Sequence, residues 1–186
     1  MRAILLALVA TLLPACAHAQ EGRLDRSETP IARATANVIV QALPETQYRA
    51  WGNRWDAVSV RVSRIVRWHI FGPDRRDRAD GAIVRRNGWL EASGAQISVS
   101  VFGDDEKVTV LTFDYDEFTN LDLVDALGDA GARVSFQSDS ESQSEYIVTP
   151  PGRESGLLVF SRLCTSEHSA AAQRCHNNAE LRFEFE

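Results

Sequence analysis

The sequence has little of what usually reveals a chemistry. Its 186 residues include only three cysteines and one methionine, and Lys107 is its single lysine. There is no Gly-x-Ser-x-Gly elbow, phosphate-binding loop, His-Glu-x-x-His pair or dinucleotide fingerprint. The common sequence routes to an enzyme are therefore missing. We expect a protein that is not an enzyme and that uses no cofactor and no metal ion.

The sequence also lacks long apolar runs and an excess of positive charge. No run reaches the roughly 18 apolar residues of an ordinary membrane-spanning helix. The formal net charge is −6, which argues against a general affinity for nucleic acid. With 44% hydrophobic and 25% charged residues, the composition is that of a folded protein. The length suits one domain of ordinary size.

Residues 1–19 have the pattern of a signal peptide. Arg2 supplies the positive charge, and an apolar stretch too short to span a membrane follows it. Ala17 and Ala19 are the small residues of a cleavage site, which would leave Gln20 as the new N-terminus. We therefore predict export to the periplasm or the medium.

A lipid anchor is the alternative. Residues 13–16, Leu-Pro-Ala-Cys, resemble a bacterial lipobox, in which Cys16 would be lipidated and become the first residue. Proline is unusual in such a motif, whereas the cleavage site after Ala19 is complete. We favour a soluble exported protein, and we expect membrane attachment only if Cys16 is lipidated.

The mature chain divides into a leader and one domain. Residues 20–44 form a polar leader and a short helix that ends at a proline, and residues 45–186 form a single domain. Residues 55–71 fit a helix by the grouping of their arginines and a strand by their β-branched content; both remain open, and we lean to the helix. Another helix is predicted from Pro73 to Asn87-Gly88, a pair typical of helix ends.

Later segments predict strands and one further helix. Alternating apolar and polar residues predict paired strands at 96–102 and 108–115. Thr119 and Asp122 have the spacing of a capping box, so a helix begins there and continues to Gly131. Further strands are predicted near Val134 and at 146–149, 157–163 and 179–186.

Together these elements predict an α+β fold. A helix followed by strands occurs twice, at about 73–117 and 119–186, which indicates two αβββ halves. We expect a mostly antiparallel sheet that the helices cover on one face.

Cys164 and Cys175 are the cysteines that remain after cleavage. Ten residues separate them, and an exported protein meets an oxidising environment. We therefore predict a disulfide that staples the last two strands and contributes about 2–3 kcal/mol. With His168 and His176 they also offer the residue types of a zinc site. Adjacent Cys175-His176 is not a usual zinc spacing, so we favour the disulfide.

An acidic stretch offers another set of candidate metal ligands. Its oxygen-bearing side chains, which suit calcium, are Asp114, Asp116, Glu117, Asn120 and Asp122. The glycine and the late glutamate of a calcium loop are missing. A strand end followed by a helix cap explains the same acids, and we favour that interpretation.

Charge is distributed unevenly along the chain. Residues 20–102 contain 13 basic and 9 acidic side chains, a balance of +4, whereas residues 103–186 contain 6 and 17, a balance of −11. Near several tryptophans lies a basic region that would suit an anionic surface, lipid headgroup or acidic partner. Its candidate residues are Arg61, Arg64, Arg67, Arg75, Arg76 and Arg78. The simpler alternative is a solvated helix face.

Residues 119–186 have a characteristic order of elements. A helix ends at Ala130-Gly131, three strands follow, and two cysteines precede a closing segment at residues 181–185. This order resembles the YbjN-type domain of bacterial proteins, whose fold is similar to that of type III secretion chaperones. The resemblance implies a small non-enzymatic α+β binding module and identifies no functional residue.

These observations predict an exported, disulfide-stabilised binding module whose partner is a protein or a component of the cell envelope. The alternative is a lipid-anchored envelope protein that uses its arginine- and tryptophan-rich region at a membrane surface. A hydrolase is a third possibility, since such enzymes are frequent among exported proteins. The sequence does not identify the partner or the oligomeric state.

Overall fold

The computed structural model describes residues 29–48, 52–68, 74–78, 81–104, 106–166 and 173–183. In β-strands, the description of residues 74–78, 81–85, 163–166 and 173–175 covers the backbone alone. The predicted signal peptide, with Cys16, lies outside the described residues.

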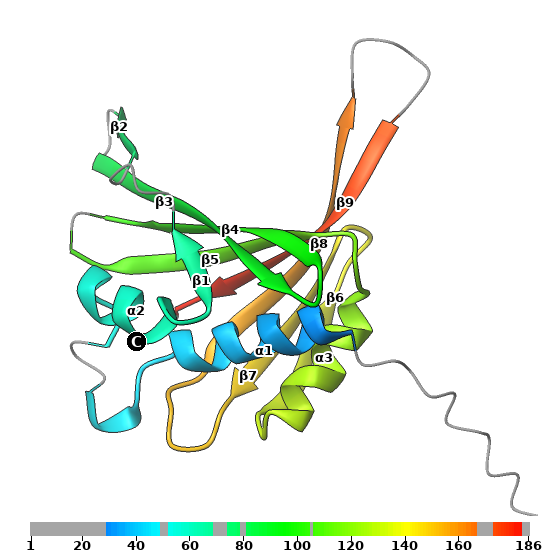
Figure 1. The fold of residues 1–186 in the computed structure, drawn as a ribbon, viewed down its shortest axis with the longest axis horizontal. Helices are drawn as coiled ribbons and strands as arrows, with labels where there is room; N and C mark the ends of the chain where they lie inside the picture. Colours follow the sequence, from blue (N-terminus) through cyan, green and yellow to red (C-terminus); the bar gives the residue numbers. More distant parts are fainter. Residues whose placement is uncertain are drawn as a thin grey trace, which may run out of the picture.

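The described residues form an α+β fold built on an antiparallel sheet (Figure 1). Nine strands belong to this sheet, and helices precede and interrupt them. In chain order the elements are α1 (Pro30–Ala42), a 3-10 helix η1 (Thr46–Tyr48), α2 (Trp55–Val62), β1 (Val66–Trp68), β2 (Asp74–Arg78), β3 (Gly81–Ala92), β4 (Ala95–Gly103), β5 (Val108–Tyr115), α3 (Asn120–Asp129), β6 (Arg133–Asp139), β7 (Gln143–Thr149), β8 (Gly156–Ser166) and β9 (Gln173–Arg182).

The order of strands across the sheet is β1-β3-β4-β5-β9-β8-β7-β6, and β2 also pairs with β3. Strands β3, β4 and β5 form one meander, and β6 to β9 form another. The two meanders meet where β5 pairs with β9. Strands that are far apart in the sequence are therefore neighbours at the centre of the sheet.

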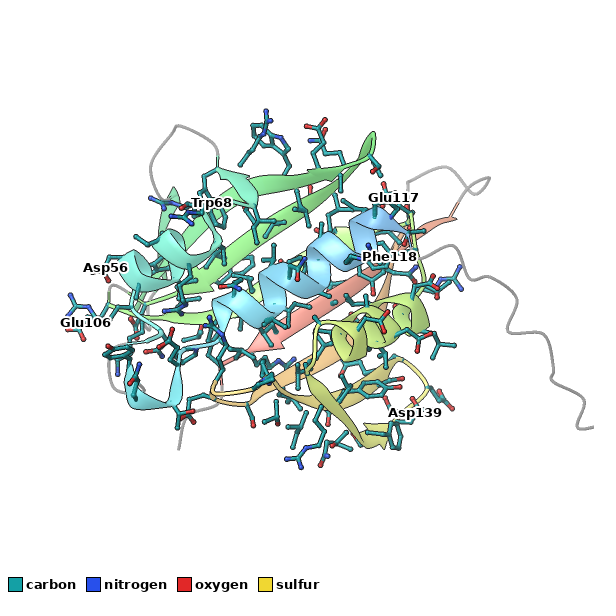
Figure 2. All side chains as sticks on the ribbon, turned by 60° about the horizontal axis from the view of Figure 1, so that its bottom comes forward. Asp56, Trp68, Glu106, Glu117, Phe118 and Asp139 are labelled. Carbon is teal, nitrogen blue, oxygen red and sulfur yellow. The ribbon has the colours of Figure 1, made fainter. Side chains whose placement is uncertain are left out.

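Helix α1 packs in the hydrophobic core of the molecule. Pro30 suits its first turn, because the ring fixes a helical φ and the missing N–H has no partner there in any helix. Ile31, Val38 and Ile39 are buried with the central strand residues, among them Phe113. Figure 2 shows α1 crossing the sheet with α3 beside it. The helix therefore belongs to the same packed unit as the residues that follow it.

The predicted helix from Pro73 to Asn87-Gly88 is wrong, because the described residues of this segment form β2 and most of β3. β3 pairs with β4 along one edge and with β1 and β2 along the other, so tertiary pairing overrides the local helix signals. Gly88 does not end a helix: it lies opposite Trp68 in the β1–β3 ladder. The first predicted αβββ half therefore lacks its helix.

The segment from 55 to 71 contains both of the structures that its pattern left open. α2 ends at Val62, and β1 begins at Val66 after a turn. Val58 and Val62, four residues apart, face the core from the helix, and β-branched Val66 is buried in the strand. The helical and the extended patterns were both real, but they belong to successive parts of the segment.

Several local predictions are confirmed. α1 covers the predicted short helix, and β4 and β5 cover the predicted pair of strands. α3 begins with a capping box in which Thr119 Oγ1 accepts from the Asp122 N–H at 3.2 Å. The Asp122 carboxylate accepts from the Thr119 N–H at 2.8 Å. Gly131, with φ of 82°, follows the helix as the left-handed residue that such an end requires.

Strands β8 and β9 extend beyond the sheet as a two-stranded ribbon (Figure 1). β8 pairs with β7 only up to Ser161, and β9 pairs with β5 only from Asn177 onward. Cys164 and Cys175 are direct register partners within the part that no third described strand supports. Two-stranded ribbons are only marginally stable, so this extension depends on its own cross-strand interactions.

Candidate functional site

The sheet topology separates the basic part of the chain from the acidic part. Strands β1 to β4 come from the region whose charge balance is positive, and β5 to β9 come from the strongly acidic region. In the sheet, β1 to β4 occupy one end, and β6, β7 and β8 occupy the other. The uneven charge along the sequence therefore becomes a separation of charge in space.

Arg61, one of the candidate residues of the predicted basic region, binds the C-terminal end of α1. Its Nε donates to the carbonyl oxygen of Gln41 at 2.9 Å, and its Nη2 donates to that of Ala42 at 2.6 Å. Nη2 also donates to the carbonyl oxygen of Gly52. The last carbonyl groups of a helix have no hydrogen-bond partners within the helix. Arg61 therefore supplies donors to carbonyl oxygens that the helix itself leaves unpaired.

Arg153, from the turn between β7 and β8, binds the same helix end. Its Nη1 donates to the Leu43 carbonyl oxygen at 2.6 Å, and its Nη2 donates to Gln41 Oε1 at 3.3 Å. Burial, followed by the positive charge of Arg153, lowers the pKa of Arg61 to about 10, and Glu45 partly opposes this shift. Arg61 therefore remains charged at neutral pH, but it donates its hydrogen bonds to backbone carbonyl groups of the protein.

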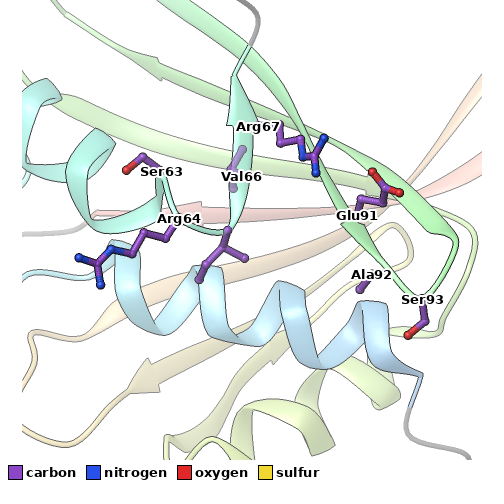
Figure 3. A pocket seen from close by; sticks show the side chains of 8 residues that line it. Ser63, Arg64, Val66, Arg67, Glu91, Ala92 and Ser93 are labelled. Carbon is purple, nitrogen blue, oxygen red and sulfur yellow. The ribbon is translucent and has the colours of Figure 1, made fainter.

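Arg64 and Arg67 are exposed and line a shallow pocket of about 340 Å³ (Figure 3). The turn after α2, strand β1, the end of β3 and the β3–β4 turn form its walls. Figure 3 shows Arg67 on the same side as Glu91, with Arg64 on the other side. The lining residues are Ser63, Arg64, Ile65, Val66, Arg67, Glu91, Ala92 and Ser93.

The β3–β4 turn places a serine at the rim of this pocket. Ala92 and Ala95 are register partners, so Ser93 and Gly94 form a two-residue hairpin loop. Both have positive φ, 50° and 85°, as a type I′ hairpin turn requires. Sequence reasoning did not include Ser93 or Glu91 in a site. The Ser-Gly pair between two strands was the available signal for this turn.

The remaining predicted arginines lie at the same edge of the sheet. Arg75, Arg76 and Arg78 are on β2, which pairs with β3, but their side chains are outside the description. Arg86, on β3, donates to Ser59 Oγ at 3.0 Å, and its guanidinium carbon lies 6.0 Å from the ring centroid of Trp68. The structure therefore gathers these arginines at one edge but leaves Arg61 inside.

The predicted acidic stretch serves the local structure. Asp114 accepts from Asn178 Nδ2 at 2.7 Å, and Asn120 Oδ1 accepts from the Tyr115 hydroxyl at 2.6 Å. Together with the capping role of Asp122, these bonds account for three of the five residues as parts of a strand end and helix cap, and Glu117 accepts from the Asp116 N–H at 2.9 Å. Burial raises the pKa of Tyr115. Among the described residues, no group of three or more His, Cys, Asp or Glu residues is arranged to hold a metal ion.

The cysteine and histidine cluster is described only in part. His168 lies outside the described residues, and for Cys164 and Cys175 the backbone register alone is known. Opposed residues in antiparallel strands have Cα atoms about 4.5–5.5 Å apart, within the range that disulfides span. The disulfide therefore stays a prediction with which the register is compatible.

No known family model matches the chain, and no solved structure matches it. The resemblance of residues 119–186 to the YbjN-type domain therefore stays a prediction. Within the described part of the chain, no helix has the length and apolar character needed to cross a membrane.

Proposed function

We propose that this protein is an exported binding module that engages an anionic partner at the β1–β2–β3 edge of its sheet. The observation that carries the proposal is the pocket between Arg64 and Arg67, at the basic end of the sheet. The partner is an acidic protein or an anionic component of the cell envelope. In this arrangement the helices cover one face of the sheet, so its edges and its other face are left for contacts.

The composition of the pocket suits an anionic group. A guanidinium stays charged at all physiological pH values and presents donors that match carboxylate and phosphate oxygens. The Ser93 hydroxyl adds a neutral donor at the rim, whereas the Ser63 hydroxyl already donates to the Val60 carbonyl oxygen at 3.1 Å. Glu91 contributes one negative charge, which favours ligands that approach from the Arg64 side. The volume of about 340 Å³ is at the lower end for small-molecule pockets, so a single acidic group of a larger partner fits it best.

The ribbon of β8 and β9 supports the export part of the proposal. Its outer part lacks a third described strand, and Cys164 and Cys175 are register partners there. A disulfide forms and persists outside the reducing cytosol. We therefore keep the disulfide as part of the proposed module, and the predicted signal peptide provides the route to an oxidising compartment.

Charge reversal tests the binding site. We would measure binding of a fluorescent polyglutamate peptide, and separately of vesicles containing anionic phospholipid, to the mature protein at low salt. The double variant Arg64→Glu/Arg67→Glu should weaken binding about tenfold or more, because two attractive contacts become repulsive. Vesicle binding without peptide binding would identify an envelope lipid as the partner class.

The matched control is Arg133→Glu/Arg162→Glu. These two arginines are also exposed, but they lie on β6 and β8 in the acidic half of the sheet. Both double variants change the net charge equally, so a specific site predicts loss in the first and little change in the second. Equal loss in both, or no binding of either probe to the unaltered protein, would contradict the proposal.

A further inference from the structure

Strand β6 forms the acidic end of the sheet and has an open edge. It is the last strand in the sheet order, and β7 is its pairing partner among the described strands. A strand pairs through alternate residues on each side, so part of the N–H and C=O groups of β6 point away from β7. Such an edge is a template for another extended chain.

An aromatic row leads from the core to this edge. The Phe160 ring on β8 is buried, and its centroid lies 5.5 Å from that of Tyr146 on β7. Tyr146 in turn lies 5.5 Å from Phe136 on β6, again edge to face. Phe136 is 59% exposed, because none of the described strands covers its outer side. One more strand beside β6 would bury it.

Acidic residues flank β6 along the chain. Asp129, at the end of α3, precedes the strand, and Asp139 and Glu141 follow Phe136 at its far end; all three are exposed. Arg133 is the single basic residue on the strand. The acids outnumber Arg133 on and beside β6, so a chain lying along the strand would gain from net positive charge and from an apolar side chain beside Phe136.

We propose that β6 binds an extended, basic segment of a partner protein as an added antiparallel or parallel strand, with an apolar side chain of that segment packed beside Phe136. A second copy of this chain, paired through its own β6, would bring together two segments that are each net acidic, so charge disfavours that occupant. This surface lies at the opposite end of the sheet from the Arg64 and Arg67 pocket, and it does not depend on the function proposed for that pocket.

The β6–β7 ladder determines how much of the β6 edge is regular enough to pair with an added strand. Residues Arg133 to Phe136 pair with β7 in regular register, and the register shifts between Phe136 and Ser138. A bulge of this kind bends a strand and interrupts the regular edge. The added segment should therefore pair mainly with residues 133–136, so that one of its apolar side chains packs beside Phe136 at the end of that stretch.

The test uses a synthetic peptide of alternating lysine and valine with a central phenylalanine, added to the mature protein. We expect binding that weakens with salt, together with slower amide hydrogen exchange in residues 133–136. Phe136→Ser should weaken binding about tenfold or more. Tyr48→Ser is the matched control, because Tyr48 is an aromatic residue with nearly the same exposure, 58%, in η1.

A second peptide keeps the test independent of any variant. Methylation of alternate backbone nitrogens on one edge of the peptide removes the donors that strand addition requires but keeps its charge and apolar groups. This peptide should bind at least about tenfold more weakly than the first. The proposal is overturned if the unaltered protein binds neither peptide, if both peptides bind equally, or if Phe136→Ser and Tyr48→Ser behave alike. Exchange protection at the β1–β2 edge instead of β6 would also refute it.

Discussion

Replacing Arg61 should destabilise the fold, although the sequence suggests a surface residue. Arg61→Met keeps most of the apolar stem of the side chain. It removes the N–H groups that donate hydrogen bonds to the carbonyl oxygens of Gln41, Ala42 and Gly52. Hydrogen bonds to charged groups contribute about 1.5–3 kcal/mol each, and they are not additive. Relief of the desolvation that lowers the pKa of Arg61 offsets part of the loss. We expect a net loss of about 2–4 kcal/mol in the free energy of unfolding.

Urea unfolding followed by far-UV circular dichroism measures this loss. Arg64→Met is the matched control, because Arg64 is exposed three residues further along the chain, in the turn after α2. It should change the free energy of unfolding by less than about 0.5 kcal/mol. Arg61→Lys should recover only part of the stability, because one ammonium group cannot reproduce the planar fork of a guanidinium. If Arg61→Met were as stable as Arg64→Met, the proposed role of Arg61 at the end of α1 would be refuted.

Three further experiments test other parts of the structure. Gly88→Ala should lower the free energy of unfolding by about 1–3 kcal/mol, because its new Cβ would lie 2.5 Å from a carbonyl oxygen of β1. Gly128→Ala is the control in the same urea assay: its new Cβ meets open space on α3, so it should be neutral or stabilising. Thiol titration of the exported protein should find Cys164 and Cys175 oxidised, and two free thiols would contradict the disulfide. Burial raises the pKa of Tyr115 above the unfolded value of about 10. The unfolded state therefore loses this proton first, so stability should fall as pH rises above about 10, and Tyr115→Phe should reduce that fall.

Local signals in the sequence predicted the elements whose ends are set by neighbouring residues. The capping box at Thr119 and Asp122 and the alternation in β4 each involve residues a few positions apart. Such interactions form regardless of where the element lies in the fold. The helix predicted from Pro73 failed because its residues form ladders with β1, β2 and β4. The β1 ladder joins residues about twenty positions apart and leaves no local signature, whereas the Ser93-Gly94 turn was the local signal for the β4 ladder.

The candidate site shows the same limit. Arg61, Arg64 and Arg67 recur at intervals of three residues, so the pattern alone groups them on one surface. Arg61 turns inward because the end of α1, some twenty residues earlier in the chain, presents carbonyl groups to it. No residue near Arg61 in the sequence indicates that those carbonyl groups will accept its hydrogen bonds. Only the packing of α1 against α2 separates the structural arginine from the two exposed ones.

The pairing of β5 with β9 decides how the two charged ends behave. This pairing directs the two meanders outward in opposite directions, so seven strand-to-strand steps separate β1 from β6. At about 4.8 Å per step, the path along the sheet is about 34 Å. The screening length at physiological ionic strength is about 8 Å, so charges at one end have little effect at the other. An anionic partner at the Arg64 and Arg67 pocket and a basic segment on β6 should therefore bind without competition, and salt should weaken both. A protein with the same net charge spread evenly over its surface would repel the first partner everywhere.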